Sequence, residues 1–350
     1  MDNCRTRANA APPHAGLFTL NRKQVLAGIS ATLFSPAVWA QSSSREFTVP
    51  IPSTSFATAS LRAAVDMGCF RKKGLTLSLP IMESGSNITA ALLSGSVQLV
   101  LGGPGELVAA QGRGQPVVLL TNCYWGQSGT LIMSKELIEK SGIARSAPLR
   151  DRLQVLKGVP IASVSATSAL TASFRGAAET VGIKPSFVYM GQPAMVAALE
   201  SGAVKGYIAS APVWGTSVTR GVGVDWVSAP RGELPDDNVP RGATGLNVLR
   251  PFADANPELM ARILDAYKDF SDSLQSSPKE VRASLARLYP TVEADAMDLL
   301  FEAEKGAWRY RDVTTDDMKH EIAFVKASGA PIPGLDKIDP QATFYARPKS

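Results

Sequence analysis

The stretch "AALLSGSV" at Ala90–Val97 and the stretch "AALESGAV" at Ala197–Val204 carry the same residue at six of eight positions. A constant offset of 107 residues separates them. Each stretch predicts the end of a helix, a turn at Gly95 or Gly202, and then a buried strand. A solenoid needs at least about three copies of a short unit, so two distant copies indicate corresponding units of two lobes.

Strand and helix patterns alternate around both copies. Strands are predicted at 47–51, 71–81, 97–103 and 116–122, and again at 156–166, 186–190 and 204–212. Helices are predicted between them at 58–70, 84–95, 167–182 and 192–202. This alternation is typical of right-handed βαβ units, and it predicts an α/β protein in which each lobe is an open mixed sheet flanked by helices.

The rest of the chain divides around these lobes. Residues 41–125 and 253–350 are predicted to form a discontinuous lobe 1, and residues 126–252 are predicted to form lobe 2. The segment after Arg250 has helical spacing, and we expect it to pack back across lobe 1. A hinge of two chain crossings is expected near 124–127 and after Arg250.

The first 40 residues are predicted to be a cleaved export signal. A basic stretch, "LNRK", precedes a short apolar run and the small residues Val38 and Ala40, which suit cleavage before Gln41. The alternative is a buried N-terminal helix, and both the secretory and the twin-arginine-like routes remain open. We therefore expect a periplasmic protein.

Composition excludes several classes of function. The net charge is +5, but the first 40 residues contain four basic residues and one acidic residue, which leaves +2 for the remainder. Nucleic-acid binding needs clustered Lys and Arg, so no nucleic-acid partner is expected. Cys69 and Cys123 are expected to be two buried free thiols, with a disulfide between them as the alternative. No zinc-ligand spacing occurs, and no cofactor or metal is expected.

Uncharged polar loops follow the predicted strands. They include "PSTSFATAS" at 52–60, "ESGSN" at 83–87, "GGPGE" at 102–106, "SATSAL" at 165–170 and "APVW" at 211–214. In open α/β sheets ligands bind beyond the carboxyl ends of strands, opposite helix N-termini. These loops are therefore expected to line a cleft, although Ser165 or Ser168 could also serve as helix caps, and Phe56 and Trp214 suit a core as well as a pocket wall.

Several of these segments together resemble one protein family. "MGCFRKKGLTLSL", "AALLSGSVQLVLGG", "LKGVPIASVSATSAL" and "AALESGAVKGYIASAPVW" resemble phrases of the periplasmic substrate-binding proteins of ABC transporters for aliphatic sulfonates, taurine, nitrate and thiamine-pyrimidine precursors. "FADANPELMARILDAYKDFSDSL" resembles their long returning helix. The resemblance runs from about Phe47 to Tyr345 and implies the type II periplasmic binding protein fold.

The resemblance also implies a ligand site. Carried across to this sequence, its residues are Ser53, Thr54, Ser55, Phe56, Gly85, Ser86, Gly103, Pro104, Ala166, Thr167, Ser168, Ala211 and Trp214. It implies a monomer that delivers a small-molecule ligand to an ABC permease in the inner membrane.

The ligand itself is less determined. The loops contain no Arg or Lys, and their only charges are Glu83 and Glu106. We expect a small organic anion of sulfonate or carboxylate type, held by hydroxyl and backbone N–H groups against Phe56 and Trp214. The alternative is a neutral pyrimidine-type heterocycle.

An enzyme is the second alternative, because relatives on this fold include sulfinate desulfinases with a nucleophilic cysteine in the first loop. Here that loop offers Ser53, Thr54 and Ser55 instead, and the only histidine after residue 40 is His320. The sequence therefore predicts a binding protein that is not an enzyme.

Overall fold

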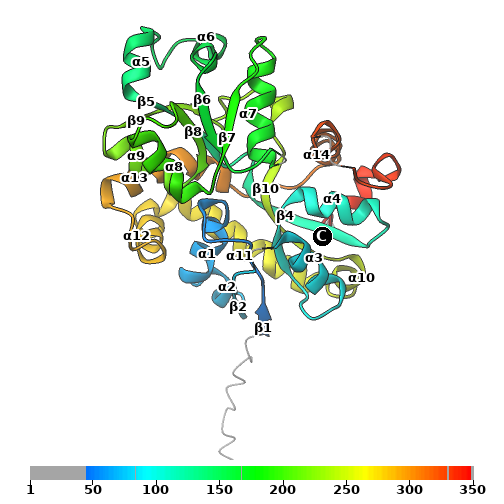
Figure 1. Ribbon diagram of the computed structural model, residues 1–350. Coiled ribbons are helices and arrows are strands. Elements are labelled where there is room, and N and C mark those ends of the chain that lie inside the picture. The colour runs from blue at the N-terminus through cyan, green and yellow to red at the C-terminus, as the bar shows by residue number, and fades with distance from the viewer. Residues whose placement is uncertain (1–44, 83, 167, 329–330, 348–350) are drawn as a thin grey trace, which may run out of the picture. The chain divides into compact units, whose positions relative to one another are not determined.

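The computed structural model describes residues 45–82, 84–166, 168–328 and 331–347. Within these residues the strands form sheets of order β1-β2, β3-β10-β4 and β7-β6-β8-β5-β9. Their bounds are β1 Arg45–Thr48, β2 Leu75–Ser78, β3 Val100–Gly102, β4 Val117–Trp125, β5 Gly129–Ser134, β6 Pro160–Ser163, β7 Ser186–Tyr189, β8 Gly206–Ser210, β9 Gly223–Ser228 and β10 Gly242–Leu249. Helices flank these sheets, so the predicted α/β class with mixed sheets is confirmed (Figure 1).

The first lobe is the part of the chain built on β1 to β4 and β10. Strands β1 and β2 are parallel, whereas β10 runs antiparallel to both β3 and β4. The two small sheets meet where the Leu101 N–H donates to the Pro50 carbonyl at 3.0 Å, and a parallel bridge between Ile51 and Ile81 continues the pairing of β1 with β2. The carboxyl ends of β1 and β3 therefore lie near one another.

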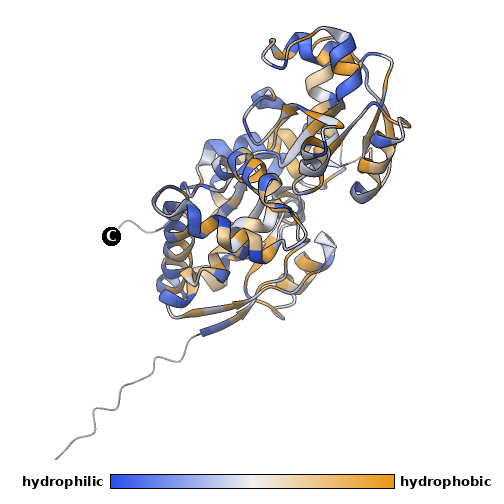
Figure 2. Cartoon of the chain, turned by 90° about the vertical axis from the view of Figure 1, so that its left-hand side faces the viewer, coloured by the Kyte–Doolittle hydropathy of each residue, from blue (hydrophilic) through white to orange (hydrophobic). Residues whose placement is uncertain are grey.

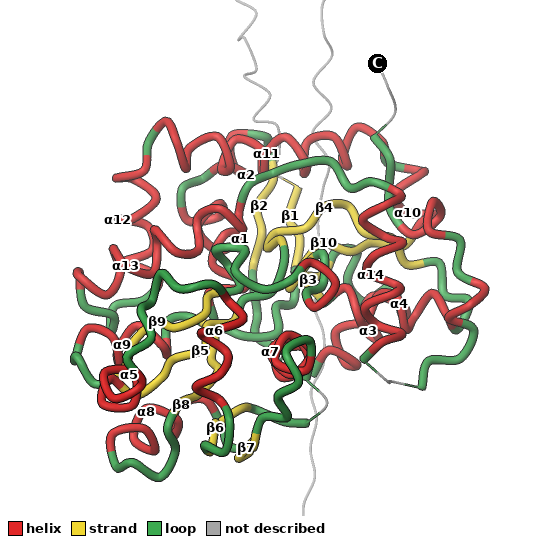
Figure 3. Tube along the Cα trace, turned by 90° about the horizontal axis from the view of Figure 1, so that it is seen from above, coloured by secondary structure: helices red, strands yellow, loops and turns green. Residues whose placement is uncertain are grey.

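The second lobe is built on β5 to β9. Strand β6 is parallel to β7 and β8, and β5 lies antiparallel between β8 and β9. Figure 3 shows the yellow strands as two groups, β1 to β4 with β10 in one and β5 to β9 in the other. This two-lobed arrangement is the one that the repeated stretch predicted.

The position of β10 corrects one boundary. We predicted residues 126–252 as lobe 2, with a chain crossing after Arg250, but Gly242–Leu249 pairs with β3 and β4 of the first lobe. The chain therefore returns from the second lobe between Ser228, which ends β9, and Gly242, which begins β10. The other expected crossing, near 124–127, coincides with the end of β4 at Trp125 and the start of β5 at Gly129.

The repeated stretch occupies equivalent places in the two lobes. It ends helix α3, Gly85–Leu93, in the first lobe and helix α8, Gln192–Glu200, in the second. Gly95 and Gly202 then adopt φ values of 75° and 76°, a left-handed conformation that side chains with a Cβ rarely adopt. The glycines thus make the turns that the sequence predicted.

Fourteen α-helices lie within the described residues. In the first lobe and the C-terminal segment they are α1 Ala59–Asp66, α2 Cys69–Lys72, α3, α4 Pro104–Gly112, α10 Arg250–Ala255, α11 Pro257–Ser276, α12 Pro278–Leu288, α13 Ala294–Glu304 and α14 Thr315–Ala327. In the second lobe they are α5 Lys135–Ser141, α6 Leu149–Leu153, α7 Ala169–Glu179, α8 and α9 Val213–Thr219. The 3₁₀ helices are η1 Phe56–Thr58, η2 Gln154–Leu156, η3 Asp236–Asn238, η4 Lys305–Trp308, η5 Leu335–Lys337 and η6 Pro340–Thr343.

Helix α11 packs against α1, α2 and β4, so the expected return across the first lobe is confirmed. Its apolar residues Leu259, Ile263 and Phe270 share one face at helical spacing and are buried, and burying each such side chain contributes roughly 1.5–3 kcal/mol. Figure 2 shows helices that carry hydrophilic and hydrophobic residues side by side, as this amphipathic packing requires. No helix within the described residues is long and apolar enough to span a membrane.

The largest core cluster reaches from the first lobe into the second. Helix α13 packs on α9, and Glu304, the last residue of α13, is fully buried. The Tyr124 hydroxyl on β4 donates to Glu304 Oε2, and burial raises the pKa of the Glu304 carboxyl to about 8. A second cluster, which includes Phe174 and Trp226, fills the far face of the second sheet.

Candidate ligand-binding cleft

A cleft of about 630 Å³ opens beside the carboxyl end of β3. Its lining residues come from both lobes, from the crossings between them and from the C-terminal segment. The first lobe contributes Pro52, Ala57, Gly85, Ile88, Gly102, Gly103, Pro104, Gly105, Glu106, Ala109, Gly242, Ala243 and Thr244. The crossings and the second lobe contribute Gln127, Ser128, Ala169 and Pro240, and the C-terminal segment contributes Glu321, Phe324, Val325, Ser328 and Ile332. The expected cleft at the ends of strands is thus present.

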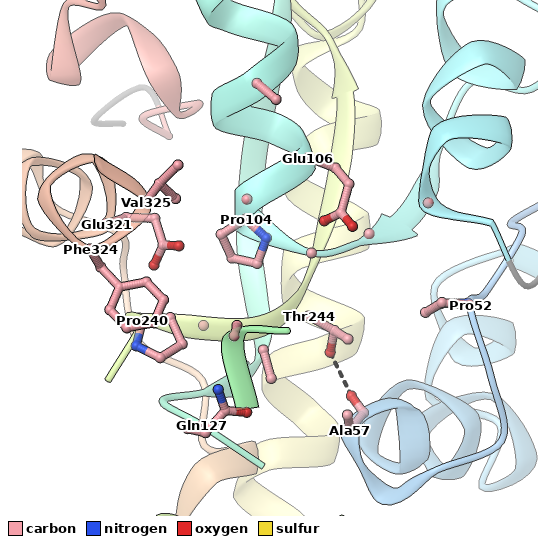
Figure 4. Close-up of a pocket in the computed structure, with 18 of the residues that line it drawn as sticks. Pro52, Ala57, Pro104, Glu106, Gln127, Pro240, Thr244, Glu321, Phe324 and Val325 are labelled. Atoms are coloured by element: carbon pink, nitrogen blue, oxygen red, sulfur yellow. Dashed lines mark hydrogen bonds between the residues drawn. The ribbon is translucent and has the colours of Figure 1, made fainter. Parts of the chain in front are cut away.

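The first-lobe wall is made by helix N-termini. Helix α3 begins at Gly85, where the Ser84 hydroxyl accepts from the Asn87 N–H, and α4 begins at Pro104 directly after β3. Pro104 suits this position because a first helical residue needs no N–H partner. On the β10 side the Thr244 hydroxyl donates to the Ala57 carbonyl at 2.5 Å, a contact drawn in Figure 4.

The second-lobe wall is small and polar. Gln127 and Ser128 follow the crossing from β4 to β5, and the Ser128 N–H donates to Gln127 Oε1 at 2.9 Å. The Ser128 hydroxyl lies 3.1 Å from the hydroxyl of Ser210, at the end of β8. Ala169 begins α7, and Ser168 caps this helix, which is the alternative role that we predicted for Ser165 or Ser168. Hydrogen bonds inside the protein therefore fix this wall.

Three predicted site residues line the cleft, namely Gly85, Gly103 and Pro104. Six other predicted site residues do not line the cleft, although each lies within three residues of one that does: Ser53, Thr54, Ser55, Ser86, Ala166 and Ser168. The Ser53 and Ser55 hydroxyls lie 3.0 Å apart and the Ser168 hydroxyl accepts from the Thr171 N–H, so these groups already have partners. Thr167 lies outside the described residues, as do Glu83 and the predicted export signal.

Phe56, Trp214 and Ala211 are core residues in the structure. Phe56 and Trp214 are fully buried, and Ala211 is 1% exposed. The Phe56 ring packs 4.7 Å from Tyr289 and 5.8 Å from Trp308 between ring centroids, and Trp214 belongs to the same cluster. We expected Phe56 and Trp214 to contact the apolar body of the ligand, but neither lines the cleft, because tertiary packing covers both side chains.

The apolar wall comes instead from a segment that the sequence analysis did not place in the site. Phe324 and Val325 on α14 face the cleft (Figure 4), and Ile332 also belongs to its lining. The helix begins with a reciprocal cap, in which the Asp317 N–H donates to the Thr314 hydroxyl and the Thr314 N–H donates to the Asp317 carboxylate. This cap satisfies backbone N–H groups at the start of the helix that carries the apolar wall.

The charged groups of the lining are both carboxyls. Glu321 is 2% exposed, and its Oε2 accepts from the Arg241 N–H at 2.7 Å. Burial raises the pKa of Glu321 to about 7, and burial also raises the pKa of Glu106 above its usual range. No Lys or Arg lines the cleft in the part of the chain that the structure describes.

Replacing Glu321 by glutamine is expected to weaken the pH dependence of stability. The folded pKa of about 7 exceeds the ordinary value of 4.5, so the folded state retains a proton that the unfolded state has lost, and stability falls as pH rises from about 4.5 to 7. Glu304 acts in the same direction up to about pH 8. Thermal midpoints between about pH 5 and 8 should fall less in Glu321→Gln than in the unsubstituted protein, and equal falls would contradict the assignment.

The cysteines and the histidine lie elsewhere. Cys69 and Cys123 are free and buried, as we predicted in preference to a disulfide between them. Burial raises the pKa of both thiols. On the α14 helix, His320 Nε2 lies 2.8 Å from the Val239 carbonyl oxygen. Asp236 and Asp237 lie close to His320, but the Arg241 guanidinium already pairs with both oxygens of Asp236.

The sequence matches the profile of the NMT1-like family over residues 52–289. The chain belongs to the NMT1-like family. A comparison with curated proteins found no match. The family profile ends before α13 and α14, so the apolar wall and Glu321 lie beyond the matched segment.

Solved structures show the same fold. The periplasmic aliphatic sulphonate binding protein SsuA from Escherichia coli superposes with a TM-score of 0.61 and 14% identity, covering 85% of this chain and 98% of SsuA. The periplasmic nitrate-binding protein NrtA from Synechocystis PCC 6803 superposes with a TM-score of 0.52 and 13% identity, covering 86% of this chain and 87% of NrtA. A cysteine-to-serine mutant of DszB in complex with biphenyl-2-sulfinic acid superposes with a TM-score of 0.58 and 14% identity, covering 84% of this chain and 96% of DszB. The two-lobed fold implied by the resemblance to periplasmic binding proteins is therefore confirmed.

Proposed function

We propose that this NMT1-like protein is an extracytoplasmic solute-binding protein that captures a small organic molecule and delivers it to an ABC permease. The observation that carries the proposal is a single cleft of about 630 Å³ whose walls include Gly103 and Pro104 of the first lobe and Gln127 and Ser128 of the second. Pockets of this size suit small organic ligands. We further propose that the protein is exported to the periplasm and acts there as a monomer.

Ligand capture would be coupled to a change between the lobes. The two lobes are joined by the short crossings at 126–128 and 229–241. A ligand that contacts both walls stabilises the arrangement in which the walls are closest, by its difference in affinity between the open and closed states. A permease that recognises the closed arrangement would then receive the protein only when it is loaded.

The lining favours the neutral heterocycle over the organic anion that we first expected. Glu106 and Glu321 are the charged residues of the lining, and the guanidinium of Arg175 on the second lobe donates to the Ala166 carbonyl at 2.8 Å. Anion sites normally supply charge-assisted donors such as Arg. An uncharged pyrimidine-type ligand needs none, and it can use Ser128, Thr244 and the backbone.

We propose that the protein is not an enzyme. A desulfinase needs an activated nucleophile, whereas the first loop offers Ser53 and Ser55, whose hydroxyls contact each other. Cys69 and Cys123 are buried away from the cleft lining, and their raised pKa values oppose thiolate formation. These observations support binding without turnover.

A thermal-shift screen of the purified chain tests this function. We expect a small uncharged heterocycle to raise the unfolding midpoint by several degrees, because a ligand at 100 times its Kd adds about 2.7 kcal/mol to the stability of the folded form. Mass spectrometry should recover that ligand unchanged after long incubation. A screen in which no small molecule shifts the midpoint, or recovery of a chemically altered product, would contradict the proposal.

A further inference from the structure

Glu106 occupies a cradle made by two glycines. It is the third residue of α4, and its carboxyl lies against Gly85, the first residue of α3, and Gly103, which precedes α4. A Cβ added at Gly85 would lie 2.7 Å from Glu106 Oε1, and one added at Gly103 would lie 2.4 Å from Glu106 Oε2. Glycine at both positions therefore leaves room for the carboxyl.

The Glu106 carboxyl lacks a cationic partner among the described residues. No side chain within the described residues hydrogen-bonds to it, and Glu106 is exposed where it lines the cleft. Close approach to Gly85 and Gly103 removes part of the hydration of the carboxyl, and this desolvation raises the pKa of Glu106. A donor from a bound ligand would satisfy the remaining lone pairs.

Glu321, the other carboxyl of the lining, is in a different position. It is 2% exposed and accepts from the Arg241 backbone N–H, so it is already satisfied by the protein. In Figure 4 Glu106 and Glu321 are drawn on opposite sides of Pro104, with Phe324 and Val325 beside Glu321. The cleft therefore has a free acceptor at Glu106 and an apolar wall on α14.

The same geometry disfavours anions. The N-termini of α3 and α4 carry partial positive charge, which elsewhere attracts a ligand carboxylate, sulfonate or phosphate. Here the Glu106 carboxyl, next to Gly85 and Gly103, already lies at both termini. A ligand anion in this place would meet a like charge instead of a free helix end.

From this geometry we infer that Glu106 determines which class of ligand binds. The ligand carries a neutral or cationic nitrogen group, such as an amine, amidine or amino-heterocycle, that donates to Glu106. Its apolar body packs on α14. The inference rests on the proposed function and narrows it. It assigns the head group to Glu106 and the body to Phe324 and Val325.

Three probes that share one ring test the inference by calorimetry: benzamidine, benzamide and benzoate. The unsubstituted protein should bind benzamidine most tightly and benzoate most weakly. Glu106→Gln should weaken benzamidine binding by roughly 10- to 150-fold, the effect of losing a hydrogen bond to a charged group, and should strengthen benzoate binding.

Glu280→Gln is a matched control. Glu280 also stands third in its helix after an initial proline, but it lies on α12 and does not line the cleft, so this variant should bind all three probes with unchanged affinity. Gly103→Ala is a second variant that keeps the charge and displaces the carboxyl, since the new Cβ would collide with Glu106 Oε2; it should also weaken benzamidine binding.

The outcomes separate the inference from the proposed function. Preference for benzoate, unchanged by Glu106→Gln, would overturn the inference and leave a binding protein for anions. Failure of all three probes to bind at millimolar concentration would also overturn it, while the thermal-shift screen would still decide whether another solute binds. Circular dichroism establishes that each variant is folded.

Discussion

Glu233→Ala is expected to lower the free energy of unfolding by about 3–5 kcal/mol, the range found when a buried ion pair loses one partner. Glu233 Oε1 accepts from Arg145 at 2.6 Å, and Oε2 accepts from Arg152 at 2.8 Å and from the Ser228 N–H at 3.1 Å. Arg152 is 6% exposed, so removal of the carboxylate leaves its guanidinium buried, with the Trp226 carbonyl as its remaining acceptor among the described residues.

Chemical denaturation measures this loss. Burial alone would raise the pKa of Glu233, but hydrogen bonds from Arg145 and Arg152 hold this pKa below its usual range. The stabilisation is therefore present above about pH 4.5 and is lost as pH falls through the lowered value. Glu136→Ala removes an exposed pair with Lys140, which solvent screens, and should cost far less stability. A loss for Glu233→Ala as small as that of the control would contradict the account.

Trp214→Ala is expected to destabilise the protein by about 3–5 kcal/mol and to leave the rank order of ligands unchanged. Trp214 is fully buried where α9 meets α13, next to the buried Glu304 carboxyl. Truncation therefore opens a cavity in the core and not in the cleft.

An exposed aromatic provides the comparison. Tyr189 on β7 is 48% exposed, so Tyr189→Ala should cost far less in denaturation experiments. Thermal-shift ranking of the same solutes with Trp214→Ala decides the role of Trp214. A changed ranking without a large loss of stability would restore Trp214 as a pocket wall.

The sequence predicted the elements whose pattern is local. The helix, glycine turn and buried strand of the repeated stretch depend on neighbouring residues, and so does the cap of α7 at Ser168. The partner of β10 is not local, because Gly242–Leu249 pairs with strands more than 100 residues earlier. An apolar strand shows the same pattern whichever sheet it joins, and the hinge was misplaced for that reason.

The site was predicted in part for similar reasons. The loops carrying Gly85, Gly103 and Pro104 were found because they follow strands, and "PGE" at 104–106 also fits a helix start that we took only as a loop. An aromatic residue after a strand suits a core and a pocket equally, so burial of Phe56 and Trp214 needed the tertiary structure. The α14 wall gave no signal, since a helical stripe of apolar residues is typical of any core-facing helix.

A crystal structure of the protein with the strongest thermal-shift ligand tests the central claim most directly. The account predicts one ligand in the cleft, in contact with Glu106 on the first lobe, with Gln127 or Ser128 on the second, and with Phe324 or Val325 on α14. A ligand bound outside this cleft, or one that contacts a single lobe only, would contradict capture between the lobes.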